Sequence, residues 1–198
     1  MDTEPERSIY LASRSPRRRE LLGQIGVRFE VMELDVDEAV LEGEAPRAYV
    51  ERVARAKAEA GWRRVEQDNL SRAPVLGADT TVAVDGRILG KPADQREAAA
   101  MLGALSGRLH EVLTALVVRF GARADSALSI SEVRFKPLSS EEIAAYVASG
   151  EWRDKAGGYG IQGRAARFVA GLRGSFSGVV GLPLYETAQL LERIGQSA

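Results

Sequence analysis

The sequence predicts an α/β protein whose central sheet is mixed. Short apolar runs typical of strands alternate along the chain with segments of helical periodicity, a pattern that packs helices against a sheet. The dipeptide Asp85-Gly86 stands between two strand-like segments, and this dipeptide favours a tight turn between antiparallel strands. The sheet is therefore expected to combine parallel crossovers with antiparallel hairpins.

In the first half of the chain, helix signals at both ends and short apolar runs define the expected elements. Ser15 and Pro16 suit the cap and first position of a helix, and Gly26 suits its far end. The expected elements are strand 9–12, helix 16–25, strand 27–34, helix 46–65, and strands 75–83 and 87–89.

In the second half, two pairs of residues have the spacing of a capping box. Asp94 with Glu97 precedes one helix, and Ser139 with Glu142 precedes another. The expected elements are helix 98–105, strands 112–120 and 130–135 around a turn at 121–126, helix 139–150, a second hairpin of strands 167–172 and 175–180, and a terminal helix beginning at Pro183 or Leu184.

The length of 198 residues is compatible with one domain or two small lobes. We find no internal repeat and no low-complexity linker. We therefore expect an N-terminal extension at 1–8 and a single domain over 9–195.

The composition excludes several classes of site. With no cysteine and only His110 as an imidazole, thiolate zinc sites, a Cys nucleophile and multi-histidine metal sites are excluded. A net charge of -1 argues against nucleic acid or a membrane surface as a general partner. No window holds about 18 uninterrupted apolar residues, and the first residues are acidic. The protein is therefore expected in the cytoplasm.

The first cluster with chemical content is basic and lies at the start of the first helix, at 13–19. Arginines in a first turn oppose the helix macrodipole, so an anion is expected to compensate them. Backbone N–H groups, serine hydroxyls and guanidinium groups at such a site together suit a phosphate. The alternative is a solvated basic run paired with carboxylates elsewhere.

The second cluster surrounds Asp79, which lies in the middle of an otherwise apolar strand. Burying a carboxylate there is costly unless a cation, a metal or a catalytic task compensates; the alternative is a structural carboxylate with hydrogen-bond partners. Asp35, Asp37 and Glu38 can supply further oxygen ligands. A catalytic metal would then be a hard ion such as Mg²⁺ or Mn²⁺.

The segment 155–163 contains four glycines, so it is expected to form turns or to approach a ligand closely. Its Gln162 amide can pair with both a donor and an acceptor on one base edge. A plain glycine-rich turn is the alternative. His110 is interpreted as structural or solvated rather than catalytic.

Five motifs in order resemble the Maf family of nucleoside triphosphate pyrophosphatases. They stand at 8–22, 76–82, 90–92, 156–163 and 179–184. The resemblance implies an elongated, inosine triphosphatase-like α/β fold, with a central twisted sheet, flanking helices and a cleft between two lobes. It also implies a divalent metal, Mg or Mn, and a homodimer.

Within the family, the sequence is similar to the branch that hydrolyses dTTP and UTP to the monophosphate and pyrophosphate. The resemblance implies Asp79 as proton acceptor and as metal ligand together with Glu38. It also assigns base selection and phosphate binding to two further sets of residues. These are Arg17, Thr80 and Gln162 for the pyrimidine base, and Ser13, Arg18, Lys57 and Lys91 for the phosphates.

Two other functions stay open at this point. One is a nucleotide-binding regulator of septum formation without catalysis, and the other is a pyrophosphatase for 7-methyl-GTP or inosine triphosphate. The sequence departs from the family at Trp152-Arg153 and at Gly158, which flank the expected substrate loop. These departures can shift selectivity without removing activity.

Overall fold

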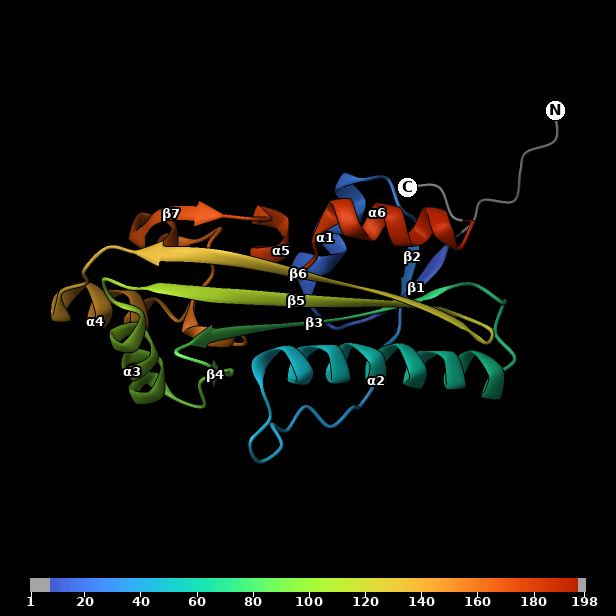
Figure 1. Ribbon diagram of the computed structural model, residues 1–198, viewed down its shortest axis with the longest axis horizontal. Helices are drawn as coiled ribbons and strands as arrows, with labels where there is room; N and C mark the ends of the chain where they lie inside the picture. The colour runs from blue at the N-terminus through green and yellow to red at the C-terminus, as the bar shows by residue number, and fades with distance from the viewer. Residues whose placement is uncertain (1–7, 196–198) are drawn as a thin grey trace.

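The computed structural model describes residues 8–195, so of the expected N-terminal extension 1–8 only Ser8 lies among the described residues. The molecule is elongated, with long strands running along its length (Figure 1). Its elements are β1 (Ile9–Ala12), α1 (Pro16–Gln24), β2 (Phe29–Val31), α2 (Pro46–Gln67), β3 (Val75–Val84), β4 (Arg87–Leu89), α3 (Gln95–Leu105), β5 (Leu109–Phe120), β6 (Arg123–Phe135), α4 (Ser140–Ser149), the 3₁₀ turns η1 (Ala156–Gly158) and η2 (Arg164–Phe168), β7 (Val169–Arg173), α5 (Phe176–Val180) and α6 (Leu184–Arg193).

The strands form one mixed sheet in the order β2-β1-β3-β5-β6-β7, and β4 is an additional partner of β3. The pairs β1–β2 and β1–β3 are parallel. The pairs β3–β4, β3–β5, β5–β6 and β6–β7 are antiparallel. The expected α/β class with a mixed sheet is confirmed.

One edge of β3 is interrupted. Strand β1 pairs with residues 75–77 of β3, and β4 pairs with residues 82–84. The other edge of β3 pairs continuously with β5 from Val75 to Ala83. The segment 78–81 therefore has a free edge between β1 and β4.

Helix α2 covers one face of the sheet, and α1, α5 and α6 lie on the other (Figure 1). Val50, Val53 and Ala54 of α2 pack against β3 and β5. The close approach depends on Gly77, because a Cβ at this position would lie 2.5 Å from the Ala54 carbonyl oxygen. A larger core on the opposite face includes Leu22, Leu116 and Leu190.

Several expected boundaries are wrong. The second hairpin does not form: β7 pairs with β6, and the segment expected as strand 175–180 contains helix α5. Ser175 explains this, because its hydroxyl caps α5 by accepting a hydrogen bond from the Gly178 N–H.

The strand expected at 27–34 is limited to 29–31, since β1 offers only residues 9–11 for pairing. The turn expected at 121–126 is confined to residues 121–122. Strand β6 begins at Arg123 because β5 is long enough to pair with it along its whole length.

The expected turns and caps are confirmed in part. Asp85 and Gly86 both have positive φ, as a type I′ hairpin turn requires. Ser139 and Glu142 form the complete capping box. Asp94 caps α3, but Glu97 accepts from the Ala93 N–H rather than from the cap residue.

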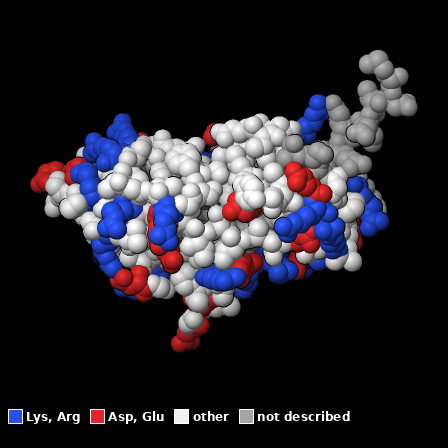
Figure 2. Space-filling view, turned by 45° about the horizontal axis from the view of Figure 1, so that its top comes forward, with Lys and Arg blue, Asp and Glu red and all other residues white. Residues whose placement is uncertain are grey.

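No helix in the described part of the chain is both long and apolar enough to cross a membrane. On the face shown in Figure 2, acidic and basic side chains are interspersed, and a broad area without charge runs across its upper middle. This face therefore presents no continuous surface of one sign.

Candidate active site

A pocket of about 910 Å³ opens at the interrupted edge of β3. It is lined by the loop before α1, the start of that helix, the middle of β3, the acidic loop before α2, the glycine-rich segment and the turn after α5. Asp79 and Thr80 are consecutive in β3, and such side chains point to opposite faces of a sheet. Both line the pocket because this stretch of β3 has no neighbour on one edge.

On the α2 side of the pocket, two lysines and two carboxylates alternate. The Lys57 ammonium lies 2.8 Å from Asp79 Oδ1 and 2.7 Å from Glu38 Oε1. Lys91 donates to the other oxygen of Glu38 at 2.9 Å. Lys57 and Asp79 are almost fully buried, whereas Lys91 is exposed. The order Lys91–Glu38–Lys57–Asp79 therefore runs from the rim to the floor.

This chain of ion pairs fixes the charge of Glu38. Burial opposes its ionisation, but the adjacent Lys57 and Lys91 ammonium groups outweigh that effect and lower the pKa of Glu38 to about 2. Asp79 Oδ1 is bound by Lys57, while Asp79 Oδ2 is buried and has no hydrogen-bond partner in the structure. An unpartnered buried carboxylate oxygen indicates a ligand or a reacting proton at this position.

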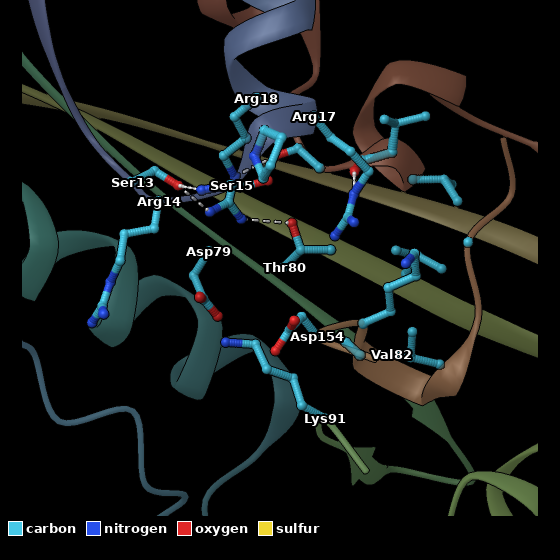
Figure 3. Close-up of a pocket in the computed structure, with 18 of the residues that line it drawn as sticks. Ser13, Arg14, Ser15, Arg17, Arg18, Asp79, Thr80, Val82, Lys91 and Asp154 are labelled. Carbon is cyan, nitrogen blue, oxygen red and sulfur yellow. Dashed lines mark hydrogen bonds between the residues drawn. The ribbon is translucent and has the colours of Figure 1, made fainter. Parts of the chain in front are cut away.

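At the start of α1, Arg18 is buried and makes three hydrogen bonds. Its Nε donates to the Gly181 carbonyl oxygen at 2.8 Å, Nη1 donates to Ser13 Oγ at 3.0 Å and Nη2 donates to Thr80 Oγ1 at 3.1 Å (Figure 3). Two of its five N–H donors stay free for an anion. Ser15 occupies the cap position without a side-chain bond to the helix, so the expected Ser15 cap is wrong in that respect; Ser13 Oγ instead accepts from the Ser15 N–H.

The residues expected to read the base share the pocket with the charged residues. Arg17, Thr80 and Gln162 all line it, and Arg17 lies beside Thr80 in Figure 3. The Arg17 Nε donates to the Val180 carbonyl oxygen at 3.4 Å, and burial lowers the pKa of its guanidinium. Two segments remote in sequence, α1 and the glycine-rich loop, therefore line one pocket.

Hydrogen bonds anchor the glycine-rich loop that lines the pocket. The Gly157 N–H donates to the Gly90 carbonyl oxygen, and the Gly160 N–H donates to the Tyr146 hydroxyl. Tyr159 Oη lies 2.8 Å from Nε2 of His110, which is buried. The structural interpretation of His110 is thus supported. The three hydrogen bonds anchor the loop to the rest of the fold.

The site fits a divalent cation through its chemistry, although the chain alone supplies few ligands. Within residues 8–195, no group of three or more potential ligand side chains of the His, Cys, Asp and Glu types is placed to hold a metal. Asp79 Oδ2 is free, and Glu38 lies one ammonium group away. Mg²⁺ is often held by one or two carboxylates plus substrate phosphates. Asp37 accepts from the Ala39 N–H, and neither Asp35 nor Asp37 lines the pocket.

Three further charged residues line the pocket without a role predicted from the sequence, namely Glu151, Asp154 and Lys155. Lys155 is half-buried, and burial together with Arg17 lowers the pKa of its ammonium group. The Lys155 stem covers Gly160, where a Cβ would lie 2.8 Å from Lys155 Cε. An acidic-basic pair directly before a glycine-rich segment is the signal that would have found two of them.

The fold and the pocket define the class: an α/β protein whose site places carboxylates next to lysine and arginine cations. The family model described as Maf-like protein matches residues 8–194, and the chain belongs to the Maf family. A dTTP/UTP pyrophosphatase of Aromatoleum aromaticum is 58% identical over 196 residues, covering 94% of this chain and 95% of that protein. One from Nitrosomonas europaea is 53% identical over 205 residues, covering 100% and 99%. The resemblance stated from the motifs is confirmed.

Proposed function

We propose that this protein hydrolyses dTTP and UTP to the nucleoside monophosphate and pyrophosphate. The observation that carries the proposal is the free, buried Asp79 Oδ2 beside a row of ammonium groups in the pocket. The similarity of the chain to proteins named dTTP/UTP pyrophosphatase supports the same reaction.

The chemistry assigned to the chain is attack of water on the α-phosphorus. The water oxygen forms a bond to phosphorus, the bond from the α-phosphorus to the oxygen bridging to the β-phosphate breaks, and pyrophosphate leaves with that electron pair. Asp79 Oδ2 accepts the proton of the water, while Lys57 holds Oδ1 and keeps the carboxylate oriented. Lys91, Arg18 and Ser13 bind phosphate oxygens and offset the charge that develops.

We propose Asp79 and Glu38 as ligands of a divalent cation, Mg²⁺ or Mn²⁺, together with substrate phosphates. Such an ion, when bound, neutralises phosphate charge and lowers the pKa of water. The free Asp79 Oδ2 and the lowered pKa of Glu38, which keeps that carboxylate ionised at neutral pH, suit this role. Displacement of the Lys57 ammonium toward the phosphates would open the space between the two carboxylates.

Arg17, Thr80 and Gln162 are the proposed readers of the pyrimidine base. A pocket whose polar groups pair with one base edge rejects a base that leaves those groups unpaired. Gln162 offers both a donor and an acceptor, and Arg17 offers only donors. These groups match the oxygen and N–H pattern that uracil and thymine share.

The test is pyrophosphate release from dTTP, UTP, CTP, GTP, 7-methyl-GTP and ITP in the presence of Mg²⁺ or Mn²⁺, with Asp79→Asn as the inactive variant. Asp85→Asn is the matched control, because Asp85 lies on the exposed hairpin turn where Asn tolerates positive φ. Selective hydrolysis of dTTP and UTP that is lost only in Asp79→Asn is expected. Preference for a purine substrate, or near-parental rates in Asp79→Asn, would overturn the proposal.

Nucleotide binding without hydrolysis by the folded parent protein would favour the regulator of septum formation. We further propose a cytoplasmic location, where nucleoside triphosphates are available, and a homodimer. Light scattering on the purified protein tests the oligomeric state, and cell fractionation tests the location.

A further inference from the structure

We propose that Thr114 is a positioning residue that orients the Thr80 hydroxyl and thereby makes the site select uracil and thymine over cytosine. The inference rests on the proposed function and concerns the base end of the same pocket. Thr114 lies on β5, directly across from Thr80 on β3. It is 1% exposed, so solvent does not compete for its hydroxyl.

The hydrogen bonds around these two threonines leave one consistent arrangement of hydrogens. Thr114 Oγ1 lies 2.8 Å from the Gly178 carbonyl oxygen, which can only accept, so Thr114 donates its single hydrogen there. The Thr80 and Thr114 oxygens are 2.9 Å apart. Because the Thr114 hydrogen is already engaged, Thr80 is the donor of that bond.

The remaining capacity of Thr80 follows from the same count. Its oxygen accepts a hydrogen bond from Arg18 Nη2 at 3.1 Å, and its hydrogen points to Thr114. A hydroxyl has one donor hydrogen and two acceptor lone pairs. Thr80 therefore has one lone pair and no hydrogen left for a ligand. In the pocket it acts only as an acceptor.

Arg18 holds this arrangement from the other side. Its Nε and Nη1 are fixed on Gly181 and Ser13, so Nη2 stays aimed at Thr80 (Figure 3). Arginine has no acceptor and cannot reverse the direction of its bond to Thr80. The chain of donors runs in one direction, from Arg18 through Thr80 and Thr114 to the Gly178 carbonyl.

A group that only accepts distinguishes the pyrimidines at N3. Uracil and thymine carry a hydrogen on N3, whereas N3 of cytosine is an acceptor. The N3–H of uracil or thymine can donate to Thr80, but cytosine would place two acceptors face to face. An unmade bond of this kind in a desolvated pocket costs about tenfold in affinity or more.

Thr114→Val tests the assignment, because valine keeps the shape of threonine and removes its hydroxyl. Without Thr114 as acceptor, the Thr80 hydrogen can turn toward the pocket and donate to N3 of cytosine. We expect the ratio of kcat/KM for UTP to kcat/KM for CTP to fall by about tenfold. Thr114→Ser retains the hydroxyl and is expected to keep the parental ratio.

Thr81→Val is the matched control. Thr81 is the neighbour of Thr80, is also buried, and has a hydroxyl without a hydrogen-bond partner. The same substitution there removes no bond in the chain from Arg18 to Gly178, so the UTP to CTP ratio should not change. Thr114→Ala replaces Thr114→Val if the valine variant does not fold.

The outcomes separate this inference from the proposed function. Equal loss of UTP and CTP hydrolysis in Thr114→Val, with the parental ratio, would make Thr114 structural only and overturn the inference. If the parent hydrolyses neither dTTP nor UTP, the proposed function fails. The Kd values of UTP and CTP, measured by calorimetry for the parent and for Thr114→Val, then test the inference without relying on hydrolysis. An unchanged Kd ratio, or no binding of either nucleotide, would overturn it.

Discussion

Lys57 is the residue that allows two carboxylates to lie close together in the pocket. Its single ammonium group contacts both Glu38 and Asp79, and it comes from α2 on the far side of the sheet from α1. A buried cation between two anions offsets their mutual repulsion and their loss of hydration. The proposed proton acceptor is therefore held in place by a residue 22 positions away in the sequence.

Lys57→Met keeps most of the aliphatic stem and removes the ammonium group. We expect kcat/KM for UTP to fall by about 100-fold or more, because Asp79 loses its orientation and the phosphates lose a cation. The acid limb of the pH–rate profile should also move to higher pH, since Lys57 contributes to the low pKa of Glu38. Lys136→Met is the control: Lys136 pairs with Glu142 outside the pocket. Equal effects of the two variants would contradict the role.

Gln162→Ala probes the base end at the same scale. Gln162 lies on the anchored loop, exposed at the pocket wall. Loss of its amide should raise KM for UTP or reduce base selectivity while kcat stays within about threefold of the parent, since the amide does not touch the reacting phosphorus. Gln189→Ala, on the exposed side of α6, should change neither quantity. A large fall in kcat alone for Gln162→Ala would assign this residue to the chemistry instead.

Residue patterns indicated much of the candidate site. A carboxylate in an apolar strand identified Asp79, and arginines opposing a helix dipole identified the start of α1. The hydroxyl chain through Thr114 was not predictable in this way. It depends on the pairing of β3 with β5 and on the Gly178 carbonyl of α5, which no local spacing encodes.

At the scale of elements, the site exists because strand β3 is longer than either partner on one edge. Strand β1 ends at Ala12, opposite Gly77, and β4 ends at Leu89, opposite Val82, which leaves the middle of β3 uncovered between them. Helix α2 closes one face beneath this opening and contributes Lys57. The position of α2 relative to β3 therefore sets the geometry of the ion pairs.

Gly77→Ala tests this dependence. The new Cβ would lie 2.5 Å from the Ala54 carbonyl oxygen and 2.6 Å from the Ala58 nitrogen, so α2 must shift. Overpacking of this kind costs roughly 1 to 3 kcal/mol in free energy of unfolding, and kcat should fall because Lys57 moves with the helix. Gly103→Ala is the control, in a helix with no atom within 4 Å of the added Cβ. It should leave kcat unchanged and stabilise by up to about 1 kcal/mol. Parental kcat in Gly77→Ala would contradict the dependence.

The elements themselves were predicted well where local signals agree and poorly where tertiary contacts decide. Pro16, Pro46 and the capping box at Ser139 fixed helix starts correctly. The segment 175–180 contains two adjacent valines, which favour a strand. It folds as α5 because Ser175 caps it and bonds to Ser131 on β6.

At the scale of the whole molecule, one part of the core supports both the stability of the fold and the candidate site. An aromatic cluster of His110, Phe135, Tyr159 and Phe168 packs with edge-to-face geometry beneath the glycine-rich loop. The loop thus rests on the same side chains that join β5, β6 and η2. Conditions that open this cluster destabilise the fold and release the wall of the pocket together.

His110 makes that coupling sensitive to pH. Burial lowers its pKa from about 6.5 to about 4, so the folded chain keeps it neutral where the unfolded chain binds a proton. Between pH 6.5 and 4 the unfolded state binds more protons than the folded state, so the free energy of unfolding falls as pH falls. The contribution of the buried His110 is fully present above pH 6.5. The loss between pH 7 and pH 5 amounts to roughly 2 kcal/mol for one such group.

Denaturant unfolding of the parent and of His110→Gln measures this contribution. His110 is the only histidine, so no other side chain with an ordinary pKa titrates between pH 5 and 6.5. Glutamine can still bond to Tyr159 and does not titrate, so its variant should show a nearly flat free energy of unfolding from pH 7 to pH 5. The same slope in both proteins would show that His110 titrates normally in the folded state. The difference in slope, rather than the absolute stability of either protein, isolates the buried imidazole.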